Sequence, residues 1–246
     1  EWVAVAVMAF PVALIVAVGR PLLAARSRRN YGILVVLGLL ALSCALMHLQ
    51  AAAGDARALL RCVLVSVHLL VLLNVVIGGR VIPMFTWAAT RGAPIHGWPL
   101  ADLLAPVASF ALMLAVALSV SGAVFAGIAA AAGAINLLRM IPWCSRATLR
   151  VPLVLVLHVG YAWIGIGQLL LAASAAGLPL AESTALHALT IGVIGTMTLG
   201  MMVRVALGHS GRAVVASRLA TLAIGLMFLA PLARLSALVL PARYWM

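Results

Sequence analysis

Long apolar runs alternate with short polar breaks along the whole chain. The runs lie at about residues 2–18, 31–51, 59–82, 101–120, 123–139, 151–173, 184–207 and 213–230. A bilayer hydrocarbon core of about 30 Å needs about 20 apolar residues per helix, so each run predicts one membrane-spanning helix. The pattern therefore predicts an all-α, polytopic transmembrane helix bundle with about eight spans, in a single transmembrane domain over residues 1–246.

Composition agrees with a membrane protein and excludes an ordinary soluble domain. Of the 246 residues, 66% are hydrophobic and 8% are charged, whereas globular proteins carry roughly 25% charged residues. The net charge of +12 comes from arginines that sit in short clusters between the apolar runs. Such spacing is typical of topology signals, so we expect a lipid bilayer as the partner and no nucleic acid.

The sixteen arginines are divided unequally between the two sides of the membrane. Four fall on the side of the N-terminus, at positions 57, 61, 234 and 243, and the other twelve fall in links on the second side. The excess of arginine predicts that the second side is cytoplasmic. Three tryptophans are expected at the same interface, Trp87, Trp98 and Trp143.

Histidines are the main candidates for holding a cofactor metal. Counting about 1.5 Å per residue along the predicted helices places His68 and His158 in the membrane interior, and His48 and His187 near the N-terminal side. Ionisable residues inside a membrane are functional candidates by default. Histidines at similar depth on different helices suit a haem iron or a copper ion, although hydrogen bonding between helices explains each one about as well.

The stretch 187–212 carries a row of small residues, Gly192, Thr196 and Gly200. Such a row favours close packing of another helix. The alternative is a flat wall for a porphyrin along the neighbouring stripe, formed by His187, Ile191, Ile194, Thr198 and Met201. Both interpretations place a neighbour against this helix, and residue types alone leave them open.

Two arginines lie slightly inside the ends of their spans, Arg80 and Arg204. They are either topology anchors or partners for haem propionates. His209 and Arg212 fall in the tight cytoplasmic link GHSGR. The chain has four carboxylates, none securely within a span, and no nucleophile–base–acid set. Any chemistry is therefore expected to belong to a bound cofactor, and an enzymatic activity stays an open question.

Three motifs point to a known family: GGRVIPMFT (78–86), LHVGYAWIGIG (157–167) and HALTIGVIGTMTLGMMVRVALGHSGR (187–212). They resemble the NnrS family, bacterial inner-membrane proteins found with denitrification and nitric-oxide responses and described as binding haem and copper. Family members resemble twelve-helix proteins with a histidine-containing N-terminal section that has no counterpart here. The resemblance therefore implies that this chain is the later two-thirds of a longer protein.

The resemblance also implies a function. We expect a multi-pass protein of the bacterial inner membrane that binds or detoxifies nitric oxide or protects metal centres from it. The expected cofactor is a b-type haem, with copper possible beside it, and the ligand is a diatomic gas such as nitric oxide. By residue-for-residue carry-over the matching positions are His158, His187, His209, Arg80, Arg204 and Arg212. His158, His187 and His209 are the expected metal ligands, whereas His48 and His68 rest on the depth argument alone.

Two other classes of function remain open. A transporter or permease would also use glycine-rich spans around a site in the membrane. In a metal-free sensor or scaffold the histidines would only join helices, and the cytoplasmic link 83–100 would be the docking surface.

Overall fold

The structure is a computed structural model that describes residues 2–90, 92 and 94–236. These residues form helices and no strand, so the predicted all-α class is confirmed. The long helices are α1 (Trp2–Ala24), α2 (Tyr31–Ala53), α3 (Ala56–Ala89), α4 (Pro99–Ala117), α5 (Gly122–Met140), α6 (Pro152–Ala175), α8 (Thr196–His209) and α9 (Arg218–Leu235). A short helix, α7 (Glu182–His187), and a π-helical segment (Ala188–Gly195) lead into α8.

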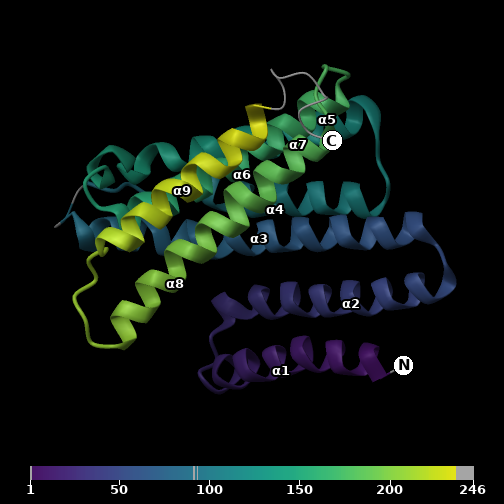
Figure 1. Cartoon of the computed structure of the whole chain (residues 1–246), viewed down its shortest axis with the longest axis horizontal. Helices are drawn as coiled ribbons and strands as arrows, with labels where there is room; N and C mark the ends of the chain where they lie inside the picture. Colours follow the sequence, from purple (N-terminus) through teal and green to yellow (C-terminus); the bar gives the residue numbers. More distant parts are fainter. Residues whose placement is uncertain (1, 91, 93, 237–246) are drawn as a thin grey trace.

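The described part of the chain has eight spans that are long and apolar enough to cross a membrane, as the apolar runs predict. Helix α7, the π-helical segment and α8 together make one of them, Glu182–His209. Successive spans run in opposite directions, so the links gather at two ends of the bundle (Figure 1). We call the end that holds the links 25–30, 90–98, 141–151 and 210–217 the arginine-rich face, and the other end the opposite face.

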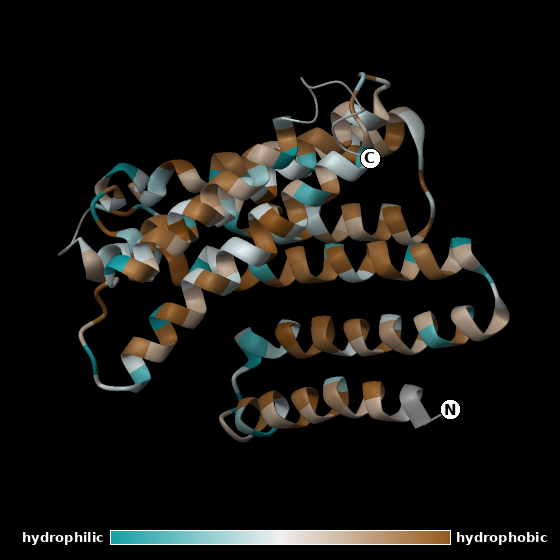
Figure 2. Ribbon diagram, in the orientation of Figure 1, coloured by the Kyte–Doolittle hydropathy of each residue, from teal (hydrophilic) through white to brown (hydrophobic). Residues whose placement is uncertain are grey.

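Helix α6 is the centre of the bundle. Inside the molecule 67% of its span is buried, against 6% of the span of α1. It packs against α3, α5, α8 and the π-helical segment. The peripheral helices turn apolar side chains outward, such as Phe10, which is 73% exposed, and Figure 2 shows that hydrophobic residues make up most of these helices. An outward apolar surface of this kind belongs in lipid, and the chain is a multi-pass membrane protein.

Helix α3 is longer than its apolar run predicts. The run ends at residue 82, but the helix continues through Pro83 to Ala89. Proline removes one backbone hydrogen bond from a helix, and neighbouring helices in a membrane bundle tolerate this loss. The last two turns of α3 therefore belong to the bundle. In consequence, Thr86 is a fully buried residue and not part of a link.

The small residues of the 187–212 stretch bring it close to α6. A Cβ on Gly192 would lie 2.6 Å from the ring of Trp163, and one on Gly200 would lie 2.6 Å from Val156. Thr196, between them, is fully buried. This row packs against a helix, which confirms the first of its two interpretations.

Candidate functional site

Polar side chains are concentrated in the interior between α3, α4, α5 and α6. Their sequence spacing puts them on inward faces: on α4, Asp102 and Ser109 are seven residues apart, two helical turns along one face. The buried polar and charged residues on these helices are His68, Thr86, Ser109, Asn136, Arg139, His158 and Gln168. A polar interior is costly in a membrane unless its groups are paired or bind something.

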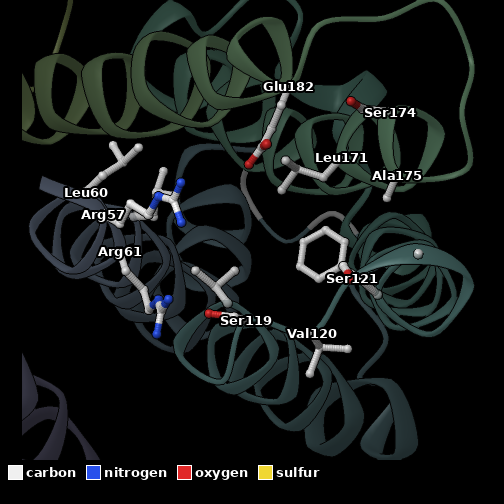
Figure 3. A pocket seen from close by; sticks show the side chains of 14 residues that line it. Arg57, Leu60, Arg61, Ser119, Val120, Ser121, Leu171, Ser174, Ala175 and Glu182 are labelled. Atoms are coloured by element: carbon white, nitrogen blue, oxygen red, sulfur yellow. The ribbon is translucent and has the colours of Figure 1, made fainter.

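A cavity of about 410 Å³ opens at the opposite face. Arg57 and Arg61 of α3 line one side of it, and Glu182 at the start of α7 extends from the other (Figure 3). Serines 119, 121 and 174 add hydroxyl groups. Leu64, one turn further along α3, also lines the cavity, which therefore reaches down into the span.

His68 lies one turn deeper than Leu64 and is 3% exposed. Its Nδ1 is 2.9 Å from the carbonyl oxygen of Leu64. A carbonyl can only accept, so Nδ1 carries the proton and donates it, and Nε2 is left with a bare lone pair. Nε2 is buried and has no hydrogen-bond partner among the described residues, where it is the one fully buried side-chain nitrogen or oxygen atom of which this is true.

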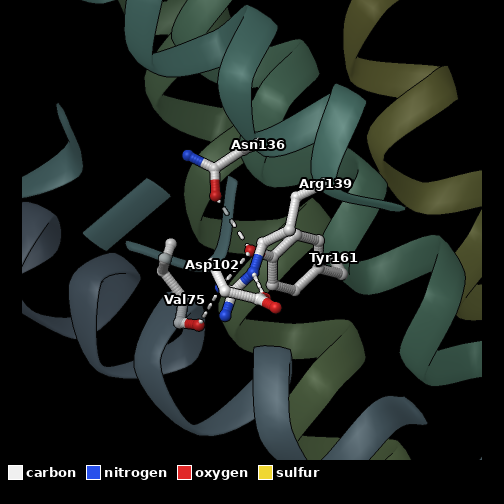
Figure 4. A network of polar contacts seen from close by, with 5 residues as sticks. All are labelled: Val75, Asp102, Asn136, Arg139 and Tyr161. Carbon is white, nitrogen blue, oxygen red and sulfur yellow. Dashed lines mark hydrogen bonds and ion pairs between the residues drawn. The ribbon is translucent and has the colours of Figure 1, made fainter. Parts of the chain in front are cut away.

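Arg139 of α5 is the hub of a polar network nearer the arginine-rich face (Figure 4). Its Nε donates to Oδ1 of Asp102 at 2.7 Å, and its Nη1 donates to the carbonyl oxygen of Val75 at 2.9 Å and to the hydroxyl of Tyr161 at 3.0 Å. The side chain of Arg139 is 5% exposed and that of Asp102 is 40% exposed. The network thus begins at a half-open carboxylate and runs inward.

The inner part of the network is made of neutral groups. Tyr161 donates its hydroxyl proton to Oδ1 of Asn136 at 2.9 Å. Asn136 donates in turn to Ser109 at 3.0 Å and to Oε1 of Gln168 at 3.1 Å. Trp143 packs edge-on against the Tyr161 ring, with the ring centroids 4.7 Å apart. These bonds, together with the one from Arg139 to Val75, tie α3, α4, α5 and α6 to one another.

His158 of α6 is held at both ring nitrogens. The hydroxyl of Thr86 is 2.8 Å from Nε2 and donates its own proton to the carbonyl oxygen of Ile82. Nε2 must therefore be the donor to Thr86, which leaves Nδ1 as the acceptor. The hydroxyl of Ser145 lies 2.8 Å from Nδ1 and supplies the proton. No lone pair of this imidazole is left for a metal.

Two glycines of α3 make the network sterically feasible. A Cβ on Gly78 would lie 3.0 Å from the ring of Tyr161, and one on Gly79 would collide with the guanidinium of Arg139. The same α3 segment carries Arg80, which donates to Oδ1 of Asn30 at 2.8 Å. The sequence GGR therefore lets an aromatic ring and a guanidinium reach the backbone of α3.

A second cavity, of about 500 Å³, lies beside the network at the arginine-rich face. Its polar lining comes from three helices and from the link before α4. It is formed by Gly79, Arg80, Pro83, Ile95, His96, Gly97, Asp102, Leu103, Arg139 and Trp143.

A family model described as NnrS protein matches residues 1–246. The chain belongs to the NnrS family. Membership supports a membrane protein of the nitric-oxide response, and it confirms the resemblance drawn from the three motifs. No curated protein and no solved structure matches the chain significantly.

The three NnrS-like motifs meet in space. Gly78 and Thr86 of the first contact Tyr161 and His158 of the second. A Cβ on Gly160 of the second would lie 2.8 Å from Met197 of the third. The motifs thus describe one packed unit built around α6.

The expected pairing of His68 with His158 at similar depth is wrong. His158 is at the level of Thr86, to which it is hydrogen-bonded, and His68 comes 18 residues before Thr86 on the same helix. That separation is about 27 Å along the axis. The error comes from the end of α3. Depth was counted from residue 82, but the helix continues to Ala89, so His68 lies further from the arginine-rich face than the count predicts.

The other pair, His48 and His187, lies on helices with different neighbours. Both side chains are half-buried. Helix α2, which carries His48, packs on α1 and α3, whereas α7, which carries His187, packs on α6, α9 and the π-helical segment. Nδ1 of His187 is bonded to the carbonyl oxygen of Ser183, so its Nε2 also bears the lone pair. Among the described residues, no three of His, Cys, Asp and Glu come together as a metal site.

The expected arginines and His209 lie apart from one another. Arg80 is bonded to Asn30, and the guanidinium of Arg204 stacks 3.8 Å above the ring of Phe85. His209 and Arg212 are exposed at the arginine-rich face. The stripe proposed as a porphyrin wall is in part open: Ile194, Thr198 and Met201 line an apolar cavity of about 370 Å³ between α3 and the Glu182–His209 span.

The residues that sequence analysis missed are those of the network. The spacing of the arginines predicts a topology role for Arg139, and Trp143 is expected at the interface. Trp143 is instead 3% exposed and packs against Tyr161 and His158. A signal was present: Asn136 and Gln168 are amides within otherwise apolar runs. Intramembrane amides usually bond to a neighbouring helix, and Asn136 does so by accepting from the hydroxyl of Tyr161.

Proposed function

We propose that this NnrS-family chain is a nitric-oxide-response protein that holds a metal, the iron of a b-type haem or a copper ion, on His68. The observation that carries the proposal is the buried lone pair on Nε2 of His68, which has no hydrogen-bond partner among the described residues. Leaving a buried polar atom unpaired costs about 1–3 kcal/mol. Coordination of a metal by Nε2 would remove that cost.

The second ring nitrogen of His68 fits the same role. Histidines that bind metals usually donate their other ring N–H to a carbonyl or carboxylate, which fixes the tautomer and the orientation of the ring. Nδ1 of His68 does this with Leu64 at 2.9 Å. His187 has the same tautomer and is the second candidate ligand. His158 is less suited, because Ser145 and Thr86 occupy both of its nitrogens.

A metal bound here would supply an open coordination position at which a diatomic gas binds. The chain itself would contribute orientation and a dry environment. The Leu64 carbonyl holds the imidazole, and neighbouring Leu69 and Val71 are each 1% exposed. The polar network of Arg139 would take no part in binding this metal. We also propose that the membrane is the bacterial inner membrane and that the arginine-rich face is cytoplasmic.

The proposal predicts that His68→Gln loses the metal. Purified protein is supplied with haemin or with Cu(I), freed of excess, and examined by absorption spectroscopy and metal analysis. The parent protein should retain about one metal per chain, with a Soret band for haem that shifts when nitric oxide is added. His68→Gln should retain less than a tenth of that amount.

His96→Gln is the matched control, because His96 is exposed in the link before α4 and should leave metal binding unchanged. Equal binding by His68→Gln and the parent protein would overturn the assignment of His68. No binding by the parent protein would overturn the metal-binding function itself.

One observation favours the transporter alternative, namely that cavities enter the same four-helix interior from both faces. Solute flux through metal-free protein in liposomes would support it over the metal-binding function.

A further inference from the structure

We propose that the cavity at the arginine-rich face binds a small organic anion, a carboxylate with a compact apolar body, and that Nη2 of Arg139 is its anchor. This site is distinct from the proposed metal ligand. Val75, whose carbonyl Arg139 holds, is seven residues from His68, which is about 10 Å along α3. The proposal therefore stands independently of the metal.

The hydrogen-bonding capacity of Arg139 is only partly used. Nε and Nη1 serve Asp102, Val75 and Tyr161. Nη2 carries two further N–H donors that have no partner among the described residues. Among the described residues, the one fully buried side-chain nitrogen or oxygen without a partner is Nε2 of His68. Nη2 of Arg139 is unpaired but is not fully buried. It therefore opens into the cavity that both Arg139 and Gly79 line.

Gly79 fixes the direction of that nitrogen. The guanidinium of Arg139, Nη2 included, lies directly against the Gly79 α-carbon, where any side chain would collide with it. Nε on one side and Nη1 on the other are already anchored by Asp102 and Val75. The plane of the guanidinium is thus held at three points. A donor held in this way is preorganised, and preorganisation lowers the entropic cost of binding.

The charge of the cavity favours an anion. Two arginines, Arg80 and Arg139, and one histidine, His96, line it together with a single carboxylate, Asp102. Oδ1 of that carboxylate is already paired with Nε of Arg139 at 2.7 Å. A bound cation would meet both arginines, whereas an anion would meet one carboxylate that is already paired. Guanidinium groups bind planar carboxylates through charge-assisted hydrogen bonds.

The shape of the cavity favours an anion with an apolar part. Its volume of about 500 Å³ is within the range of small-molecule sites, roughly 300–1,000 Å³. Pro83, Ile95 and Leu103 add apolar wall to the same cavity. Trp143, which is 3% exposed, provides an aromatic wall beside Arg139. An inorganic ion would leave most of this surface unused.

Asp102→Asn gives a test with a defined sign. The amide oxygen can still accept from Nε of Arg139, but the negative charge beside the ligand is gone. We expect benzoate, used as the probe with purified metal-free protein and followed by calorimetry, to bind at least threefold more tightly to Asp102→Asn than to the parent protein. Benzamide and benzylammonium, the neutral and cationic analogues, should show no binding to either protein at the same concentrations.

Asp55→Asn is the matched control. Asp55 caps α3 at the opposite face by accepting from the backbone of Ala58 at 2.9 Å, and asparagine caps a helix about equally well. This variant should bind benzoate as the parent protein does. Unchanged or weaker benzoate binding by folded Asp102→Asn, tighter binding of benzylammonium, or no benzoate binding by the parent protein would overturn the proposal.

Leu103→Trp keeps the proposal testable if Asp102→Asn fails to fold. Leu103 is 63% exposed at the mouth of the cavity, so a larger side chain is tolerated by the fold while it fills the space. Benzoate binding should fall at least tenfold in this variant. Undiminished binding would place the anion elsewhere and overturn the assignment of this cavity.

Discussion

His68 and His158 are both buried in the same four-helix interior, yet they are opposite tautomers. His158 carries its proton on Nε2, and its lone pair on Nδ1 is occupied by the hydroxyl of Ser145. His68 carries its proton on Nδ1, and its lone pair on Nε2 is unpaired among the described residues. Burial alone therefore does not make an intramembrane histidine a candidate ligand. The difference lies in which nitrogen the protein has already used.

The comparison extends to the two halves of the interior. Towards the arginine-rich face, Arg139, Tyr161 and Asn136 hold one another in a continuous chain of hydrogen bonds. Towards the opposite face, the interior is apolar around His68 and ends in an open cavity lined by Arg57 and Glu182. The first half is held together by paired polar groups, whereas the second half contains a buried histidine nitrogen that no described group pairs. Variants in each half should therefore act differently.

The largest expected effect is that of Arg139→Met. It leaves the hydroxyl of Tyr161, the carbonyl of Val75 and the carboxylate of Asp102 without their common donor. Breaking a buried ion pair costs about 3–5 kcal/mol, and because Asp102 is 40% exposed we expect about 3 kcal/mol. Denaturation in detergent measures the loss. Arg146→Met, at an exposed position, is the control, and an equal loss in both variants would contradict the role of Arg139.

A smaller effect is expected from Gly79→Ala. The added Cβ would collide with the Arg139 guanidinium, which is anchored and cannot move freely. Overpacking of this kind costs about 1–3 kcal/mol. Gly38→Ala is the matched control, since nothing lies within 4 Å of a Cβ there, and a helix gains about 0.5–1 kcal/mol from this change. The two variants should shift the midpoint of unfolding in opposite directions, and equal shifts would contradict the packing argument.

The fold could be predicted from the sequence because each span is long and apolar by itself. Every predicted run corresponds to a candidate membrane span. Successive spans cross in opposite directions, so the direction of each span follows from its place in the chain. The boundary at residue 82 failed because Pro83 ends a helix in water more readily than in a packed bundle. That one boundary displaced the depth assigned to His68. The presence of a span depends on its own apolar residues, but the position at which its helix ends depends also on the helices packed around it.

The candidate site could be predicted only in part, since its chemistry depends on pairing. The sequence identifies His68 and His158 as polar groups in apolar runs. The sequence does not show that Ser145, in a separate link, occupies the lone pair of His158. Nor does it show that the lone pair of His68 has no partner among the described residues. Arg139 resembles any arginine at the end of a span, and only its contact with Asp102 on another helix distinguishes it.

The smallest effects, and the sharpest contrast, are expected from replacing each histidine by leucine in metal-free protein. His158→Leu removes two hydrogen bonds and leaves the hydroxyl of Ser145 without its acceptor, at a cost of about 1–2 kcal/mol. His68→Leu removes the unpaired buried Nε2 together with the single bond from Nδ1 to Leu64, and the first change should outweigh the second and stabilise the protein by about 1 kcal/mol. The two midpoints of unfolding should therefore move in opposite directions. Destabilisation by His68→Leu equal to that by His158→Leu would contradict the difference drawn between the two histidines.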